Sequence, residues 1–367
     1  MVERLTSQLG VGQILQVSPE QFRKLLLAWY DAHARDLPWR ESRDPYRVWI
    51  SEIMLQQTRV AAVIAHYREF LRRFPAVEKL ARAREASVLA AWSGLGYYRR
   101  ARMLHAAAKV VARRGTFPET SEELRQLPGI GRYTAAAIAS IAFGECVAVV
   151  DGNVERVLQR VLGRRMSGGD FWIAAEELLD RERPGDFNQA MMELGATVCT
   201  PRSPSCLTCP VMEVCATRGE MGGAVKPARQ RKREIHYALD CCGGRVLLVQ
   251  RARDASLMPG MWELPELARP SRAKARSTGA DKIAALKALR HPKASACNNV
   301  KACLTLKHSI TVTDYTVRVW RRSAPSRVAG KWIAVEKMSE VALTGLARKI
   351  LRKAEIIYGL SRRLTLN

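Results

Sequence analysis

The sequence contains no uninterrupted run of about 18 apolar residues, the length that a membrane-spanning helix needs. Its first residues, MVERLTSQLGVGQILQ, also lack the basic start and apolar core of a secretory signal. We therefore expect no membrane span and no secretion, and a reducing, cytoplasmic compartment. There the nine cysteines are expected to be thiols or metal ligands rather than disulfides.

Acidic residues are scarce relative to basic ones, with 35 Asp and Glu against 60 Lys and Arg and a net charge of +25. Such an excess predicts a polyanionic partner: nucleic acid first, an anionic membrane surface second. The excess is uneven, because residues 217–367 hold 31 basic and 11 acidic residues while residues 1–216 hold 29 and 24. The basic character therefore belongs mainly to the C-terminal part.

The chain length predicts two or three domains, and the residue pattern changes once along it. Residues 1–216 are predicted to be nearly all helix, because apolar residues recur every three or four positions in stretches such as QFRKLLLAWYDAHA. The Gly-rich and basic segment 217–234 is typical of a linker. Residues 235–367 predict a small α+β domain, with helices at AALKALR and ALTGLARKILRKAEIIYGL. Its strands are expected at IHYALDCC and RVLLVQR, joined by a short Gly turn, and along LTLKHSITVTDYTVRVWRR.

Four cysteines, Cys199, Cys206, Cys209 and Cys215, have the spacing C-x6-C-x2-C-x5-C. Zinc modules usually use two separated C-x2-C pairs or mixed cysteine and histidine ligands, whereas this segment has one such pair and no nearby histidine. Four thiolates on one short loop favour a [4Fe–4S] cluster, with zinc as the alternative. The other five cysteines are expected to pack without a special role.

The stretch LPGIGRYTAAAI predicts two helices joined by a tight turn, over about residues 124–143. Gly129 and Gly131 would offer backbone N–H groups at a helix N-terminus, where an anion such as a DNA phosphate is favoured. Glycine is expected there because a Cβ would block close approach of a phosphate. About 20 residues later the apolar run VAVVD ends at Asp151, and this combination is more specific than the turn alone.

LPGIGRYTAAAI followed by VDGNVERVL resembles the helix-hairpin-helix DNA glycosylase superfamily that includes endonuclease III. The resemblance implies a mainly α catalytic region, with a six-helix domain and an iron–sulfur domain, and it places Asp151 beside a flipped nucleotide. The cysteine spacing is similar to that of endonuclease III and its MutY relatives, which further favours a [4Fe–4S] cluster.

Glu52 stands in the otherwise apolar stretch RVWISEIMLQQTRV, where burial would raise its pKa and let it hold a proton near neutrality. This stretch resembles the SEVMLQQT motif of MutY-type adenine DNA glycosylases, as do LPWR at 37–40 and GLGYYRRAR at 94–102. Tyr133 occupies the position of the lysine of endonuclease III-like enzymes and cannot form a Schiff base. The resemblance therefore favours a monofunctional glycosylase.

That family carries a C-terminal Nudix-like domain, and MPGMWELPE at 258–266 resembles its tryptophan-containing signature. The acidic box of Nudix hydrolases is missing, so this domain is expected to bind rather than to hydrolyse a pyrophosphate. Family members show Phe-Ser-His on the hairpin that reads the opposite strand, whereas this sequence shows Leu306, Lys307 and His308. The departure leaves the contacts to 8-oxoguanine open.

The resemblance implies hydrolytic removal of flipped adenine paired with 8-oxoguanine or guanine, with Glu52 protonating N7 and Asp151 stabilising the sugar cation. Tyr133 would pack against the site, and Asn153 would orient Glu52 or a water, with helix capping as the alternative. The remaining expected substrate contacts are the adenine pocket at Trp39, Arg40 and Gln189, the gap-filling side chains Gln57 and Tyr97, and His308.

The expected partner is double-stranded DNA with an A:8-oxoguanine or A:G mispair; we expect no membrane partner and a monomer. Three alternatives stay open. The first is an endonuclease III-like glycosylase/lyase that acts on oxidised pyrimidines. The second is a DNA-binding scaffold without catalysis, against which the pair Glu52 and Asp151 argues. The third is a Nudix hydrolase, against which the missing acidic box argues.

Overall fold

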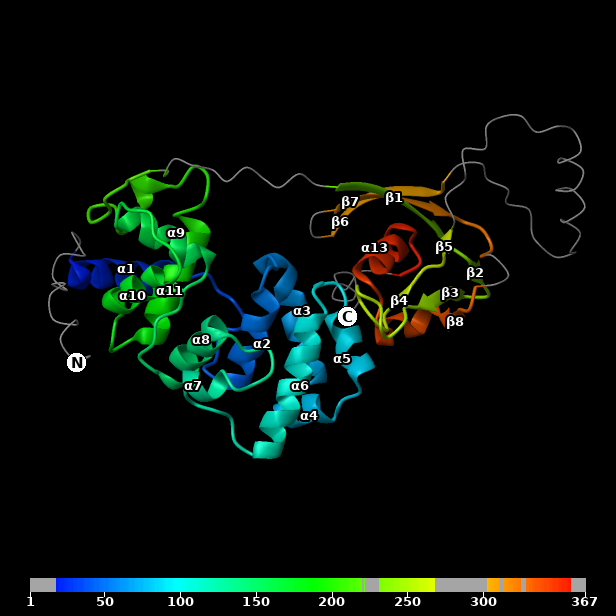
Figure 1. Ribbon diagram of the computed structural model, residues 1–367, viewed down its shortest axis with the longest axis horizontal. Helices are drawn as coiled ribbons and strands as arrows, with labels where there is room; N and C mark the ends of the chain where they lie inside the picture. The colour runs from blue at the N-terminus through cyan, green and yellow to red at the C-terminus, as the bar shows by residue number, and fades with distance from the viewer. Residues whose placement is uncertain are drawn as a thin grey trace, which may run out of the picture. The chain divides into compact units, whose positions relative to one another are not determined.

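The computed structural model describes residues 18–219, 221, 231–267, 302–310, 313–324 and 328–357. The chain divides into two compact units (Figure 1). The helical unit comprises Met1–Glu85 and Arg99–Val225, and the C-terminal unit comprises Ala86–Tyr98 and Lys226–Asn367. Within the described residues, no helix has the length and hydropathy needed to cross a membrane.

The described part of the helical unit contains helices and no strand, as its periodicity predicts. The helices are α1 (Pro19–His33), α2 (Pro45–Leu55), α3 (Val60–Arg73), α4 (Val77–Arg82), α6 (Arg99–Arg114), α7 (Ser121–Leu124), α8 (Arg132–Phe143), α9 (Gly152–Val161), α10 (Gly169–Leu178) and α11 (Pro184–Thr197). The cysteine loop follows α11 and includes the short 3₁₀ helix η2 (Cys206–Thr208).

Local sequence sets where the key helices begin. Ser18 and Asp44 each precede a proline and accept a backbone N–H with the side chain, so they cap α1 and α2. Asp151 caps α9 in the same way. Helix α2 packs on α8, and α11 packs on α1, α8 and α9. These caps therefore fix the ends of helices that belong to one packed group.

The C-terminal unit is α+β, as predicted. One four-stranded sheet has the order β5 (Glu266–Leu267), β1 (Arg231–Ala238), β7 (Thr313–Trp320) and β6 (Leu304–Ile310), with β1 and β7 parallel. The other joins β2 (Cys241–Cys242), β3 (Arg245–Gln250), β4 (Trp262–Glu263) and β8 (Lys331–Ala334). Helix α13 (Gly345–Lys353) lies between the sheets in Figure 1, and η3 (Val335–Glu340) precedes it. The apolar face of α13 packs in one core with residues of both sheets.

Three predictions for this unit need correction. The strand over IHYALDCC is in fact two, because Leu239 and Asp240 interrupt it; only β2 pairs with β3 across the Gly turn, and β1 joins the other sheet. The last four linker residues, 231–234, lie in β1 because they pair with β7. The last helix begins at Gly345, since Thr344 caps it. AALKALR lies outside the described residues.

A short segment of the N-terminal sequence groups with the C-terminal unit. It contains α5 (Glu85–Trp92) from Ala86 onward and the turn up to Tyr98. Within this unit, the hydroxyls of Ser93 and Tyr98 both donate to the Leu343 carbonyl, at 2.7 and 3.0 Å.

Candidate active site

A cavity of about 680 Å³ opens between α2, α8, α11 and the start of α9. This volume lies within the range of roughly 300–1,000 Å³ that is usual for small-molecule sites. Nine of the residues singled out from the sequence line it: Trp39, Arg40, Glu52, Gln57, Gly131, Tyr133, Asp151, Asn153 and Gln189. Tyr97 and His308 belong to the C-terminal unit, and the four cysteines line a separate hollow.

Glu52 is buried on α2, where only 6% of it is exposed, and its Oε2 accepts a hydrogen bond of 2.7 Å from the Tyr133 hydroxyl. Burial raises the pKa of Glu52 to about 7, and the charge of Asp151 adds to the rise, against the opposing effects of Tyr133 and Arg40. The carboxyl can therefore hold a proton near neutral pH, as its apolar sequence setting predicts.

The raised pKa of Glu52 makes stability depend on pH. Its ordinary value is 4.5, so the penalty for ionising the buried carboxyl is absent below pH 4.5, grows as pH rises and is complete above about pH 7. Glu52→Gln, which is always neutral, is expected to raise the free energy of unfolding at pH 8 by about 3 kcal/mol and to leave it unchanged near pH 4.5. Denaturant melts at both pH values measure this; an equal effect at the two would contradict it.

Asp151 uses both carboxylate oxygens within its own helix start. Its Oδ1 accepts the backbone N–H groups of Asn153 and Val154, at 2.9 and 2.8 Å, and its Oδ2 accepts the Asn153 side-chain amide at 2.8 Å. The structure thus gives the capping role to Asp151, and Asn153 contacts Asp151 rather than Glu52. The carboxylate is held in a fixed direction at the edge of the cavity.

Arg156 extends this arrangement towards the cysteine loop. One guanidinium nitrogen donates to the Asn153 side-chain oxygen at 2.9 Å, and Nε donates to the Cys199 carbonyl at 2.8 Å. Two side chains therefore join the carboxylate of Asp151 to the backbone of the first cysteine.

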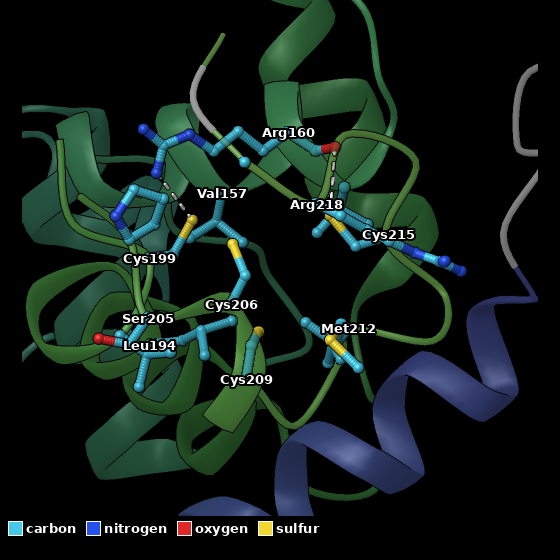
Figure 2. Close-up of a pocket in the computed structure, with 15 residues that line it drawn as sticks. Val157, Arg160, Leu194, Cys199, Ser205, Cys206, Cys209, Met212, Cys215 and Arg218 are labelled. Atoms are coloured by element: carbon cyan, nitrogen blue, oxygen red, sulfur yellow. Dashed lines mark hydrogen bonds between the residues drawn. The ribbon is translucent and has the colours of Figure 1, made fainter. Parts of the chain in front are cut away.

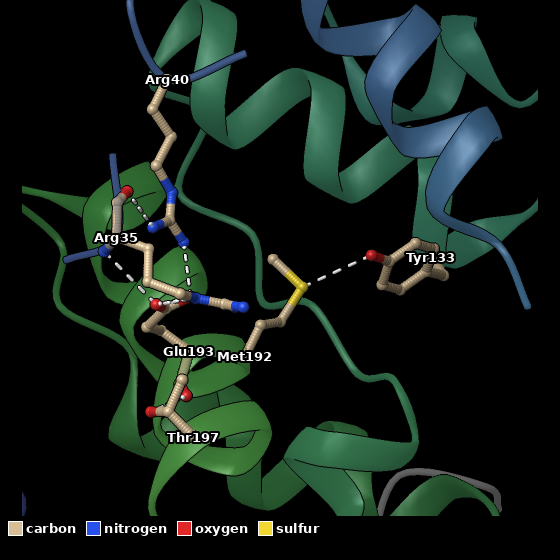
Figure 3. Close-up of polar contacts among 6 residues, drawn as sticks. All are labelled: Arg35, Arg40, Tyr133, Met192, Glu193 and Thr197. Atoms are coloured by element: carbon tan, nitrogen blue, oxygen red, sulfur yellow. Dashed lines mark hydrogen bonds and ion pairs between the residues drawn. The ribbon is translucent and has the colours of Figure 1, made fainter. Parts of the chain in front are cut away.

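Glu193 is a cavity residue that the sequence reasoning missed. It is 2% exposed on α11 and accepts hydrogen bonds from Arg35, at 2.5 and 2.8 Å, and from Arg40 at 2.9 Å (Figure 3). Burial alone would raise the pKa of Glu193, but the two arginines hold it below its ordinary value. The ion pairs fix Arg40, whose guanidinium also lies 5.3 Å from the centre of the Tyr30 ring.

Trp39 and Gln57 line the same cavity, and each has one distinctive structural feature. Trp39 is buried and meets the Tyr67 ring edge to face at 5.6 Å, so it forms a fixed apolar wall. Gln57 has a left-handed backbone with φ of 54°, an unusual conformation for a residue with a side chain. Such strain is typical of functional positions, so the backbone conformation of Gln57 indicates a functional role independently of its sequence motif.

The structure confirms the predicted hairpin at the PGIG turn, but Gly129 is needed there for a different reason from the predicted one. Gly129 has φ of 78°, and a Cβ there would come within 2.4 Å of the Met103 side chain. Backbone conformation and packing therefore require it, whatever the turn binds. Gly131 is the N-cap of α8 and a Cβ would meet nothing within 4 Å, so its position leaves the helix N-terminus accessible.

The cysteine hollow suits a group with four thiolate ligands. Cys199, Cys206, Cys209 and Cys215 all line it together with apolar side chains, and Figure 2 shows their sulfur atoms around its centre. The buried guanidinium of Arg160 lies 3.3 Å from Cys199 Sγ and also donates to the Thr200 carbonyl at 2.7 Å. In the described residues, no three cysteine, histidine or acidic side chains form a site for a single metal ion.

The helical fold and its hairpin are those of a superfamily of base-excision DNA repair proteins. Residues 50–168 match the HhH-GPD superfamily of base excision DNA repair proteins, and the chain belongs to this superfamily. It is similar to a solved thermostable thymine-DNA glycosylase, with 31% identity, a TM-score of 0.51, and coverage of 55% of this chain and 96% of the other.

Among characterised proteins, the chain is similar to adenine DNA glycosylases. The mouse enzyme, Mus musculus, is 42% identical over 67% of this chain and 60% of its own length. The Arabidopsis thaliana enzyme is 41% identical over 68% of this chain and 48% of its own length. The chain therefore spans about three fifths or less of these relatives.

Residues 199–215 match the iron-sulfur binding domain of endonuclease III. The four thiols in the hollow fit this match, and the loop is a site for a [4Fe–4S] cluster rather than for zinc. Such a cluster would take one thiolate from each cysteine and hold the loop closed.

The cluster gives a direct prediction for the purified protein. It should contain about four irons per chain and absorb near ~400 nm, as four-thiolate clusters do. Cys209→Ser is expected to lower both signals, whereas Cys146→Ser, at an exposed cysteine outside the loop, should change neither. Metal analysis and the absorbance spectrum decide, and colourless protein with stoichiometric zinc would refute the assignment.

Proposed function

We propose that this chain is an adenine DNA glycosylase that removes adenine paired with 8-oxoguanine or guanine in duplex DNA. The observation that carries the proposal is the pair of carboxyl groups in one cavity: Glu52, with a pKa of about 7, and Asp151. The similarity to adenine DNA glycosylases supports it. Two carboxyls held in different environments are the pattern expected for an acid and an ion stabiliser.

In the proposed reaction, a flipped adenosine enters the cavity and the Glu52 carboxyl protonates adenine N7. The C1′–N9 bond then breaks, and its electron pair leaves with the protonated base. The Asp151 carboxylate stabilises the sugar cation that remains, and water adds to C1′ and loses a proton. Tyr133 keeps Glu52 oriented through its hydrogen bond of 2.7 Å, and Trp39 and Arg40 form the pocket wall.

The cavity favours hydrolysis without strand cleavage by an amine. A Schiff base with the sugar needs a lysine or terminal amine as nucleophile. The residues that line the cavity, all within the described ranges, include Tyr133 at the relevant position and no lysine. This supports the monofunctional reaction over the endonuclease III-like alternative.

The C-terminal unit would read the base opposite adenine through β6. His308 lies there beside Lys307, and it pairs in register with Tyr315. Burial and the nearby Lys349 lower the pKa of His308, which therefore favours its neutral form. Ser309 donates to Asp314 at 2.5 Å, so its hydroxyl proton is already engaged. A neutral His308 could offer one donor and one acceptor to a base.

The proposed substrate is consistent with the charge of the chain. The excess of basic residues would bind the phosphate backbone without reading sequence. We propose that the protein acts on DNA as a monomer and, in a bacterium, within the nucleoid.

A panel of duplexes tests the proposal. Each carries one modified pair: A:8-oxoguanine, A:G, A:T or an oxidised pyrimidine opposite adenine or guanine. Free adenine should appear from the first two only, measured by chromatography of the released base. Release of the oxidised pyrimidine, with adenine left in place, would instead support the endonuclease III-like activity.

The pH dependence follows from the role of Glu52 as an acid. Its protonated fraction falls as pH rises through about 7, so the single-turnover rate constant should fall about tenfold per pH unit well above that value. The measurement is a rate series from pH 6 to 9 at saturating enzyme. A rate that rises across this range would contradict the acid role.

A further inference from the structure

The turn that carries Tyr97 is held from both sides within the C-terminal unit. Tyr97 is 50% exposed and has a left-handed backbone with φ of 48°. On one side, the buried indole of Trp92 donates to the Gly96 carbonyl at 3.2 Å. On the other, the Tyr98 ring is buried and its hydroxyl donates to the Leu343 carbonyl at 3.0 Å. An unfavourable conformation persists only where its surroundings impose it, so we attribute the left-handed backbone of Tyr97 to these contacts.

The acceptor in this arrangement is itself fixed. Leu343 is fully buried, and its carbonyl also receives the Ser93 hydroxyl at 2.7 Å. The residues on either side of Leu343 are bound to β4. The backbone N–H of Trp262 donates to the Ala342 carbonyl, and the Trp262 carbonyl accepts from the Thr344 amide, both at 2.9 Å. The Leu343 carbonyl is therefore a fixed acceptor of two hydrogen bonds, just before the Thr344 cap of α13.

Two consecutive residues of α13 connect this turn with the strand that carries His308. Arg348 Nε donates to the Ser93 hydroxyl oxygen at 2.9 Å, which completes a chain from Arg348 through Ser93 to Leu343. Lys349 Nζ donates to the Lys307 carbonyl on β6 at 2.7 Å. Side chains one residue apart on a helix point in different directions, so one helix can hold two separate elements.

We propose that Arg348 is a positioning residue that couples base reading on β6 to the placement of Tyr97. In this arrangement α13 fixes both β6 and the turn that carries Tyr97. When a base binds to β6 in the correct position, Tyr97 is therefore already positioned. The proposal rests on the proposed adenine excision, in which Tyr97 fills the gap left by the flipped base.

The experiment compares Arg348→Met with Arg348→Lys and with Arg352→Met in the full chain. Arg352 is exposed on the same helix, so its variant removes the same charge without the Ser93 contact. Hydrogen exchange should show about tenfold faster exchange in residues 92–98 for Arg348→Met only, since a charged hydrogen bond is lost. The ratio of single-turnover excision rates on A:8-oxoguanine and A:G should also fall about tenfold. Arg348→Lys should recover part of both.

The two readouts separate the inference from the proposed function. If the wild type excises no adenine, the proposed function fails. Unchanged hydrogen exchange at 92–98 in Arg348→Met would independently overturn the positioning role of Arg348. If exchange rises but the excision ratio does not change, α13 holds the turn without serving base reading and the coupling is wrong. Thermal melts check that Arg348→Met folds; if it does not, Ser93→Ala replaces it with the same expected outcomes.

Discussion

Glu52→Gln is expected to slow adenine excision by about 10²–10⁴-fold, the range in which a general acid contributes to a rate. Glutamine has the size of glutamate and can still accept the Tyr133 hydrogen bond, but it carries no acidic proton. The pocket should therefore keep its shape and lose only the proton transfer to N7. Single-turnover kinetics on an A:8-oxoguanine duplex measure the loss.

Binding provides the control for this result. The dissociation constant for the same duplex should change less than about threefold, because the buried Glu52 side chain is not expected to contact a phosphate. Glu119→Gln removes an exposed carboxylate and should leave the rate unchanged. An unchanged rate in Glu52→Gln would remove Glu52 from the mechanism.

Asp151→Asn is expected to slow excision by about 10²–10³-fold, the size of effect seen when one group that stabilises developing charge is removed. Asparagine caps helices about as well as aspartate, so the start of α9 should stay intact. The variant loses the negative charge that stabilises the sugar cation in the proposed reaction. Single-turnover rates, with thermal melts alongside, separate the chemical loss from any structural one.

A second helix cap offers the matched control. Asp44 caps α2 with the same kind of bond, to the Arg47 amide at 2.9 Å, and Asp44→Asn makes the same chemical change away from the reacting atoms. Its excision rate should stay within about twofold of the wild type. Equal losses in Asp44→Asn and Asp151→Asn would mean that capping, rather than charge, accounts for the effect.

The sequence indicated Glu52 as the candidate acid because its carboxylate stands in an apolar stretch that resembles the SEVMLQQT motif of MutY-type enzymes. Glu193 stands in a similar setting, NQAMMELGA, and the same signal could have found it. Its partners Arg35 and Arg40 lie more than 150 residues earlier, and no local pattern connects them. Helix capping at DGNV was predicted as an alternative for Asn153, and the structure assigns it to Asp151 instead.

Long-range pairing explains the other misses. The alternation in IHYALDCC indicates strand, but periodicity does not say that β1 pairs with β7 in one sheet while β2 pairs with β3 in the other. The grouping of Ser93 and Tyr98 with Leu343 joins positions about 250 residues apart. Gly129 was predicted correctly as a turn glycine, but only the fold shows that Met103 occupies the space of a side chain.

In the proposed function, the cavity hydrolyses the bond between adenine and its sugar without cutting the strand. The direct measurement incubates the protein with an end-labelled duplex that contains one A:8-oxoguanine pair and divides the product into two portions, with and without hot alkali. We predict strand breaks at the adenine position only after alkali, which cleaves the abasic site. Breaks without alkali, or none in either portion, would contradict the account.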